Sequence, residues 1–487
     1  MSHHIVAGLV IRWSAWIFRP RLRWSALAIS RQRHGGAKLG RARSGRVPDM
    51  ISQKTRIAAS TTVLAVVLGA ALVACGSNDP IGTVGGTGQA GGEVTETEAP
   101  TPTASEEPVQ VVTGQVPADA AAQMAALSEP LFPLAVAGAD QAVNPAYSPL
   151  SVYLALGLVA NGASGQSAQQ FADLLGGDTD KVNALAAGVM TEYITTGDGP
   201  TLAVANSLWL DNAFTVNPDY SVAARAVFRA EVATLNLQTE GQERINAWVE
   251  QMTNGLIEQI VEQVPPGALA YLVNALYFKG AWAEEFIPEL TDNQSFTLAD
   301  GTVVQVPTML ATDLYASYFK TEAGEGIVLP YKGGRFGMLM VMPAAGVDQV
   351  SWDGTQVAAW LAATEGYAGI ELYLPKWESE LAVDLTDSLK SLGLVAPFEG
   401  SGEDLVGIGT AGGRAGQITE VAHKAVVKVD EFGTEAAATT SAGMAMAAPP
   451  TEPVMVHFNR PFVFALVDRD TGLPLFLGQV DNPLLTP

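Results

Sequence analysis

The feature that most constrains this chain is an uncharged stretch of small residues near its C-terminus. Between Glu435 and Glu452 there is no charged residue and no proline before Pro449, and only Met444 and Met446 are larger than threonine. Such a segment is a poor surface loop, because it offers few polar groups to water, but it is a plausible strand. Its composition is also compatible with an Ala/Thr linker.

Read as a strand, the segment has two faces of small side chains, because successive residues point to opposite sides of a sheet. One face carries Thr434, Ala436, Ala438, Thr440, Ala442 and Met444, and the other carries Glu435, Ala437, Thr439, Ser441 and Gly443. Side chains this small can enter between two packed strands without clashing. Ordering about 12–15 residues costs about 1–2 kcal/mol each, so insertion has to recover that cost from new hydrogen bonds and packing, as a metastable starting state allows.

The N-terminal region predicts export rather than folding. Residues 1–49 carry ten Lys or Arg residues and one acid, and we interpret them as a spurious extension from an upstream start codon, with the true start at Met50. Residues 50–74 then form a basic start and an apolar run that ends in Leu-Val-Ala directly before Cys75, which resembles a bacterial lipoprotein signal with Cys75 as the lipidated residue. A transmembrane helix is the alternative, but the apolar run is far shorter than the ~20 residues that a span needs.

The chain beyond the signal is acidic and begins with a tether. Removing residues 1–74 leaves 15 of the 27 basic residues and 49 of the 50 acidic ones, which opposes binding to nucleic acid or to an anionic membrane surface. The lipid alone is therefore expected to hold the protein at a membrane. Residues 75–117 are rich in Gly, Thr, Pro and Glu and predict a flexible tether, followed by one domain over residues 118–487.

Hydrophobic patterning predicts a mixed α and β domain with large sheets. Ser148 is expected to cap a buried helix that ends near Leu158, and apolar residues at helical spacing predict a second helix over residues 242–262. Runs rich in β-branched and aromatic residues predict five strands, over residues 201–210, 269–278, 336–342, 425–429 and 461–467.

Four stretches carry a family pattern: residues 144–169, 272–286, 421–440 and 458–483. In this order they resemble the serpins, a family of serine protease inhibitors. The resemblance implies an α+β serpin fold, in which large mixed β-sheets are surrounded by helices and a reactive-centre loop is exposed near the C-terminus. It also implies inhibition as a suicide substrate: a protease cleaves the loop and forms an acyl-enzyme, and the loop then inserts into the main sheet and traps the protease.

The resemblance also assigns roles to individual residues. The inhibitory hinge corresponds to Glu431, Gly433, Thr434, Glu435, Ala436, Ala437 and Ala438. The polar cluster beneath the opening sheet, called the shutter, corresponds to Ser148, Ser151, Asn274 and His423. Trp282 corresponds to the tryptophan of the breach, where insertion begins. Read without the family, His423 could be a satisfied buried histidine and Trp282 an ordinary core residue.

The bait bond is placed by counting from the hinge, which gives Ala447-Ala448. Counting back from Phe458 instead gives Pro450-Thr451, which implies a loop a few residues longer than usual. Proline before the bond suits few proteases, so Ala447-Ala448 is preferred, followed by Met446-Ala447 and then Met444-Ala445. These apolar residues suit elastase-, subtilisin- or chymotrypsin-like serine proteases, which are the expected partners of an exported, monomeric cell-surface lipoprotein or extracellular protein.

An enzyme and a non-inhibitory serpin are the competing interpretations. Beyond the signal the only histidines are His423 and His457, and the sequence lacks a Gly-rich phosphate loop, a His-Glu-x-x-His motif and a nucleophile elbow. We therefore expect no catalytic residues, no cofactor and no metal. The abnormal loop length is the best support for a serpin fold that serves as a binding or surface interaction protein instead.

Overall fold

The computed structural model describes residues 109–138, 143–194, 199–322, 324–344, 354–399, 404–434 and 454–486. The predicted lipidation residue Cys75, the hinge residues 435–438 and the candidate bait bonds at residues 444–448 lie outside these ranges. Within them, helices and strands alternate along the chain without a repeat. The α+β class expected from the sequence is confirmed.

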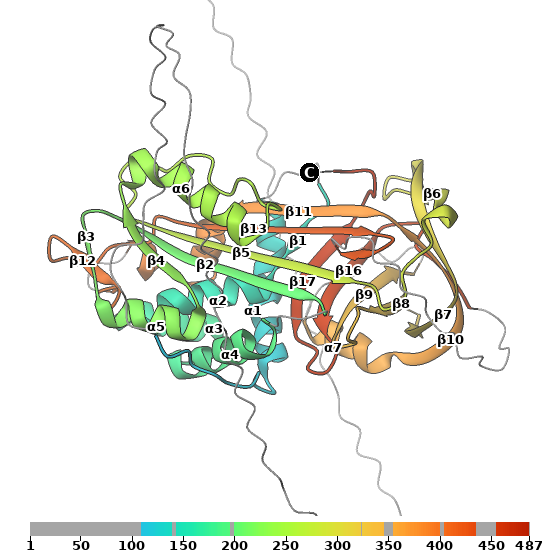
Figure 1. Ribbon diagram of the computed structural model, residues 1–487, viewed down its shortest axis with the longest axis horizontal. Helices are drawn as coiled ribbons and strands as arrows, with labels where there is room; N and C mark the ends of the chain where they lie inside the picture. The colour runs from blue at the N-terminus through green and yellow to red at the C-terminus, as the bar shows by residue number, and fades with distance from the viewer. Residues whose placement is uncertain are drawn as a thin grey trace, which may run out of the picture. The chain divides into compact units, whose positions relative to one another are not determined.

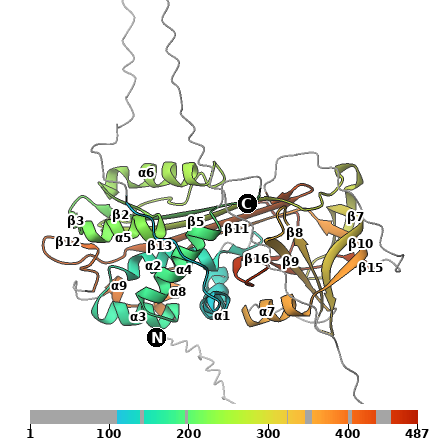
Figure 2. The same cartoon turned by 60° about the horizontal axis from the view of Figure 1, so that its bottom comes forward.

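A six-stranded sheet forms one layer of the fold (Figure 1). Its strands, in spatial order, are β11 (Trp377–Asp384), β13 (Glu420–Asp430), β14 (Gly433–Thr434), β5 (Ala270–Ala281), β2 (Thr201–Asp211) and β4 (Glu231–Leu235). Helix α6 (Leu237–Met252) covers one face, and α2 (Pro149–Ala160) packs on the other face against β2 and β5 (Figure 2). Both faces are covered, so β2 and β5 are apolar on both sides.

A nine-stranded sheet forms the second large layer. In spatial order it contains β1 (Ala146–Tyr147), β17 (Pro474–Val480), β16 (Phe462–Asp468), β9 (Phe336–Pro343), β8 (Gly324–Pro330), β7 (Val303–Lys320), β10 (Glu365–Pro375) and β15 (Val454–His457), with β6 (Asp292–Thr297) paired to β7. Strands β1 and β17 pack against β11, so this sheet adjoins the β11–β13 side of the six-stranded sheet. A short pair of β3 (Phe214–Val216) and β12 (Gly409–Ala411) lies apart from both sheets.

The remaining helices fill the space beneath the six-stranded sheet and beside the nine-stranded one. They are α1 (Ala120–Ala137), α3 (Gly165–Leu175), α4 (Thr179–Glu192), α5 (Pro218–Phe228), α7 (Gly354–Ala363), α8 (Thr386–Ser391), α9 (Ala396–Glu399) and the short 3-10 helix η1 (Pro288–Leu290). Among the described residues only α1 has the length and apolarity of a membrane span. Its buried residues Met124, Leu127 and Leu131 belong to the main hydrophobic core, so α1 is a core helix.

The predicted elements are largely confirmed, with one correction. Ser148 is the N-cap of α2, and its hydroxyl accepts a hydrogen bond from the Ser151 amide. The five predicted strands correspond to β2, β5, β9, β13 and β16. The helix expected over residues 242–262 is wrong at both ends, since α6 covers Leu237–Met252. Asn254 and Gly255 adopt left-handed backbone angles that end it, and Leu256, Ile257 and Ile260 reach the same small core from a non-helical segment.

Candidate functional site

The candidate site is the line along which β13 and β5 meet. From Glu420 to Ala425, β13 pairs in parallel with Tyr271–Leu276 of β5. Beyond that point the two strands separate, and β14 lies between them, antiparallel to both. The six-stranded sheet is therefore closed at one end and parted at the other, and the residues that fill the gap lead directly into the uncharged small-residue segment.

Gly433 is the residue that lets the chain enter this gap. Its φ is 147°, and a β-carbon added there would lie 2.0 Å from the carbonyl oxygen of Gly280 and 2.8 Å from the α-carbon of Ala281. Only glycine allows this close approach between backbones. The next residue, Thr434, is 1% exposed, and its hydroxyl lies 2.6 Å from the hydroxyl of Tyr331. The side chain of Thr434, just before the uncharged small-residue segment, thus already points into the core.

Trp282 and Tyr331 frame the turn that precedes β14. Their rings stack with centroids 4.6 Å apart, and both side chains are buried. The Trp282 indole donates to the carbonyl oxygen of Asp430 over 3.0 Å, and the Trp282 amide donates to that of Phe432 over 2.9 Å. The predicted breach tryptophan is therefore part of the apolar core. It also holds the backbone of Asp430 and Phe432, in the turn that leads into β14.

Glu431, the first of the predicted hinge residues, is fixed by an ion pair. Its carboxylate accepts hydrogen bonds from Lys376 and from the Thr291 hydroxyl, both over 2.8 Å. Burial by itself would raise the pKa of the Glu431 carboxyl, but these hydrogen bonds outweigh it and hold the pKa below its usual value. Glu431 is thus a charged anchor directly before β14. Its partner Lys376 was not singled out in the sequence.

The four predicted shutter residues come together where β13 and β5 are still paired. His423 and Asn274 are register partners across the two strands. The Ser148 amide donates to Nε2 of His423 over 3.3 Å, and the Ser151 hydroxyl donates to the Asn274 side-chain oxygen. All four are at most 1% exposed. The cluster ties the N-terminal end of α2 to the closed part of the sheet.

Asn206 completes this cluster, and sequence reasoning missed it. The Asn274 amide nitrogen donates to the Asn206 side-chain oxygen over 2.5 Å, and the two residues are register partners between β5 and β2. The available signal was an amide side chain next to Ser207 in the middle of the apolar run from Leu202 to Leu210. A buried amide needs partners, so such a residue indicates a polar network within the core.

His423 is neutral in this cluster. Burial lowers the pKa of its imidazole to about 3, because no counter-charge offsets the loss of water. Nε2 accepts the hydrogen bond from Ser148, so the proton resides on Nδ1, which is buried and has no hydrogen-bond partner in the described structure. The closed sheet therefore contains an unsatisfied donor next to the pair that would have to separate if the sheet opened.

No metal-binding group of side chains accompanies this arrangement in the part of the chain that the structure describes. There, no group of three or more His, Cys, Asp or Glu side chains is arranged to hold a metal ion. His457, the other histidine beyond the signal, lies on β15 against the ring of Tyr373, with ring centroids 5.0 Å apart. The site consists of strands, a gap and a buried polar cluster.

Comparison with known proteins assigns the chain to a family. The profile of the family described as "Serpin (serine protease inhibitor)" matches residues 131–483. Serpin-Z2B of Triticum aestivum is 33% identical over 366 residues, covering 70% of this chain and 91% of the wheat protein. A protein of Cyanea capillata named "Serine protease inhibitor" is 32% identical over 370 residues, with coverages of 72% and 94%.

Solved structures agree with this assignment. The native thermophilic serpin tengpin superposes with a TM-score of 0.69 at 27% identity, covering 77% of this chain and 96% of tengpin. Serpin48 of Tenebrio molitor gives a TM-score of 0.66 at 26% identity, with coverages of 75% and 98%. The fold, the matched profile and the relatives agree: the chain belongs to the serpin family, a family of serine protease inhibitors and not of enzymes.

Proposed function

We propose that this serpin traps serine proteases as a suicide substrate, by inserting its cleaved loop between β13 and β5. The observation that carries the proposal is the position of β14: Gly433 and Thr434 already pair with both strands at the mouth of the gap. Continuing the same strand requires only that the six parallel pairs from Glu420 to Ala425 separate. After Glu435, uncharged small residues follow for more than the length of those pairs.

The alternation of side chains matches the surroundings of the gap. Thr434 faces the core, so Ala436, Ala438, Thr440, Ala442 and Met444 would follow it on the core side of an inserted strand. That strand would run between His423 and Asn274, whose cluster is held by hydrogen bonds instead of interlocked apolar side chains. Hydrogen bonds of this kind can re-form with a new strand, and this makes the closed sheet separable.

The chemistry of trapping needs nothing from this chain except a cleavable bond. The protease serine oxygen attacks the carbonyl carbon of Ala447 and forms an ester, while the amide bond to Ala448 breaks. The serine proton passes through the protease's general base to the amine of Ala448, which becomes a new N-terminus. Water would ordinarily hydrolyse the ester, and insertion of residues 435 onward would distort the protease before that step.

Placing the bait bond at Ala447-Ala448 predicts the effect of one substitution. Ala447→Arg is expected to make the protein a trypsin inhibitor and to weaken inhibition of elastase-like proteases by roughly 100-fold, because the side chain at this position selects the protease pocket. The measurement is the yield of boil-stable complex with trypsin and with elastase.

Ala438→Arg is the matched control for this substitution. It offers trypsin the same side chain inside the inserting part of the loop, and should give cleavage without a complex. Equal complex yields with trypsin for the two variants would contradict the proposed bond. Met446-Ala447 and Met444-Ala445 are the next candidate bonds. The peptide that cleavage releases distinguishes them, because it would begin at Ala447 or at Ala445 instead of at Ala448.

The fold alone does not establish inhibition. Human thyroxine-binding globulin superposes with a TM-score of 0.66 at 21% identity, and its structure is described as a complex with thyroxine. A non-inhibitory binding protein is thus the second candidate function. Its expected result is a loop that proteases cut without forming a complex.

Export and anchoring complete the proposal. Lipidation of Cys75 would place a monomeric inhibitor at a cell surface, with the lipid as its membrane contact, and release from the surface would make it extracellular. The relatives named above come from wheat and a jellyfish, so the bacterial origin suggested by the signal remains a prediction. Intact-mass analysis of the membrane fraction tests it: an unmodified chain that begins upstream of Cys75 would exclude lipidation.

A further inference from the structure

An apolar cavity lies beneath the six-stranded sheet, at the end where β5 begins and β2 ends. It holds about 180 Å³ of empty space, part of it open to solvent. This end of the domain is the one marked by β3 and β12 in Figure 1. The cavity is lined mostly by side chains of the main hydrophobic core: Leu210, Phe214, Ala270, Leu405, Ile408 and Ile418. Protein interiors are normally close-packed, so this space can accept a further apolar side chain.

The pairing of Thr434 sets the position of every residue in a strand that continues β14. Thr434 lies opposite Gly280 on β5 and opposite Val429 on β13. Its hydroxyl is bonded to that of Tyr331, which opens the turn between β8 and β9. If this turn is fixed in place, the register of an inserted strand can be counted from Thr434.

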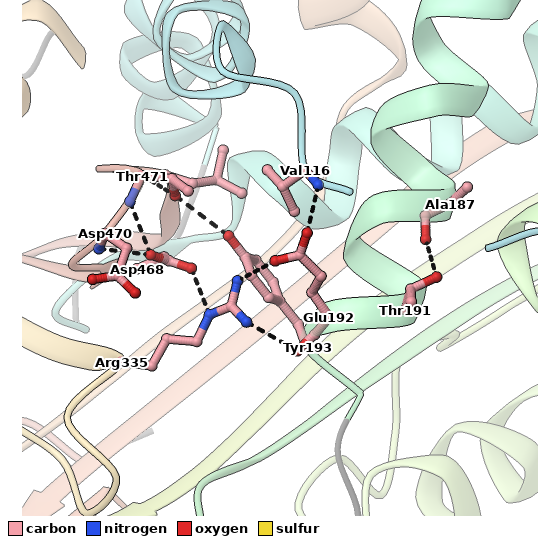
Figure 3. A network of polar contacts seen from close by, with 10 residues as sticks. Val116, Ala187, Thr191, Glu192, Tyr193, Arg335, Asp468, Asp470 and Thr471 are labelled. Atoms are coloured by element: carbon pink, nitrogen blue, oxygen red, sulfur yellow. Dashed lines mark hydrogen bonds and ion pairs between the residues drawn. The ribbon is translucent and has the colours of Figure 1, made fainter. Parts of the chain in front are cut away.

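An ion network fixes the turn that begins at Tyr331 (Figure 3). The Arg335 guanidinium binds the Glu192 carboxylate, at the end of α4, over 2.6 Å. It also binds the Asp468 carboxylate over 2.8 Å, and the Asp468 side chain is completely buried. A charged group held between two partners at partly buried positions has little freedom to move. Thr434 is therefore a fixed origin for the register.

Counting ten residues along the strands brings Met444 to the cavity. A strand that continues β14 runs antiparallel to β5, so Met444 lies as far after Thr434 as Ala270 lies before Gly280. The face agrees as well, because Thr434 points into the main core and residues an even number apart in a strand share a face. An inserted Met444 would thus point into the cavity beside Ala270.

The side chains between these two points also match their surroundings. On the core face, the inserted strand would place Ala436 beside Phe278, Ala438 beside Leu276, Thr440 beside Asn274 and Ala442 beside Leu272. The one hydroxyl among them thus reaches the buried polar cluster. Counting along β13 places the same hydroxyl opposite His423, whose Nδ1 has no hydrogen-bond partner in the described structure. Polar therefore meets polar, and alanine meets the larger neighbours.

Methionine is a suitable side chain for such a cavity. Its unbranched thioether chain adapts to irregular apolar space, and filling the cavity gives the lining atoms the contacts that they lack. The stabilisation would favour the inserted form of the loop. Met444 lies three residues before Ala447, so it would act on the part of the strand next to the bond that carries the protease.

We propose that the apolar cavity beside Ala270 is the binding site for the Met444 side chain of the cut loop. Met444 in the cavity stabilises the far end of the inserted strand. The inference rests on the proposed function, because Met444 reaches the cavity only if the loop inserts between β13 and β5. It adds a specific contact that insertion by itself does not require.

The test compares Met444→Ala with Met446→Ala in the chain from Gly76 to Pro487, before and after a protease cuts the loop beyond residue 446. The two substitutions remove the same atoms, but residue 446 would lie past the start of β5 at Ala270 and past the cavity. Cutting should raise the guanidinium chloride midpoint of the wild type and of Met446→Ala equally, because the inserted strand pairs with both neighbours. Met444→Ala should lower the midpoint of the cut form by about 0.5 M or more, as the loss of a buried methionine predicts. The midpoint of its uncut form should match that of the wild type.

Oxidation by hydrogen peroxide gives a second measurement that needs no substitution. Methionine is converted to its sulfoxide where the reagent reaches the sulfur, and mass spectrometry locates the added oxygen. Cutting the loop should slow oxidation of Met444 relative to that of Met446 by about tenfold or more. The protein is kept as a monomer, checked by size-exclusion chromatography.

The outcomes separate this inference from the proposed function. A midpoint that rises on cutting, with equal effects of the two substitutions and equal oxidation of the two methionines, would overturn the inference and leave trapping intact. A midpoint that does not rise on cutting would contradict insertion, and with it the route of Met444 to the cavity. Protection of Met444 found only in oligomers would place the loop of a second copy in the cavity and would also overturn the inference.

Discussion

A chain carrying Thr434→Arg is expected to be cut by its target protease and to form almost no boil-stable complex. Thr434 lies just before the uncharged small-residue segment, and its side chain is inside the sheet. It is 1% exposed and hydrogen-bonded to Tyr331. Arginine has no room there, and an unpaired buried guanidinium costs several kcal/mol. The arginine side chain is excluded from the sheet, so residue 434 cannot start the inserting strand, insertion becomes slower than deacylation and the protease escapes. The measurement is the number of inhibitor molecules consumed per protease molecule inactivated, which should rise by about 100-fold or more.

Thr434→Ser is the matched control, because it keeps the hydroxyl and fits the same space. The Thr434→Arg chain should lose the local pairing of β14 and keep the rest of the fold, since the pairing of β13 with β5 from Glu420 to Ala425 does not involve residue 434, and the Thr434→Ser chain should keep both. Circular dichroism and the unfolding midpoint check this. Wild-type complex yield from the Thr434→Arg chain would contradict insertion between β13 and β5 as the trapping step.

Replacing Asn274 by leucine is expected to destabilise the native state by about 2–5 kcal/mol. The two side chains have similar size, so the loss is of hydrogen bonds and not of packing volume. The Ser151 hydroxyl loses its acceptor and the Asn206 side-chain oxygen loses its donor, both in a fully buried environment. Urea unfolding of the purified chain measures the change as a lower midpoint with an unchanged slope.

Asn293→Leu supplies the control for this prediction. Asn293 is exposed on β6 and takes part in none of these contacts, so its substitution should change the free energy of unfolding by less than about 0.5 kcal/mol. An Asn274→Leu chain as stable as the wild type would mean that the polar cluster contributes nothing to closing the sheet, which would remove the physical basis for the shutter role of these residues.

The sequence predicts those parts of the fold whose signals are local or belong to the family pattern. The cap at Ser148 follows from a serine before proline and an apolar helix, and the shutter residues follow from the resemblance, with His423 and Asn274 then found opposite each other. The end of α6 was missed because apolar residues continue at helical spacing beyond Met252. They do so because Leu256, Ile257 and Ile260 pack on the same core without being helical.

Other features depend on contacts that a sequence does not show. How far the hinge enters the sheet is decided by where β13 and β5 separate, and this is a property of their pairing register. Asn206 becomes part of the shutter cluster only because β2 brings it opposite Asn274. Val112, Gly114 and Val116 donate backbone amides to α4 and α5, and every residue except proline carries such an amide. Residues 109–117 therefore have the composition of a tether and yet lie against the body of the protein.

The most direct test of the account mixes the chain from Gly76 to Pro487 with elastase, subtilisin and chymotrypsin, followed by denaturing electrophoresis and mass spectrometry of the released peptide. The account predicts a boil-stable band at the summed mass of inhibitor and protease with at least one of the three, and a released peptide that begins at Ala448. Clean cleavage of the loop by all three at short times, with no such band, would contradict trapping and leave a serpin fold whose function is binding.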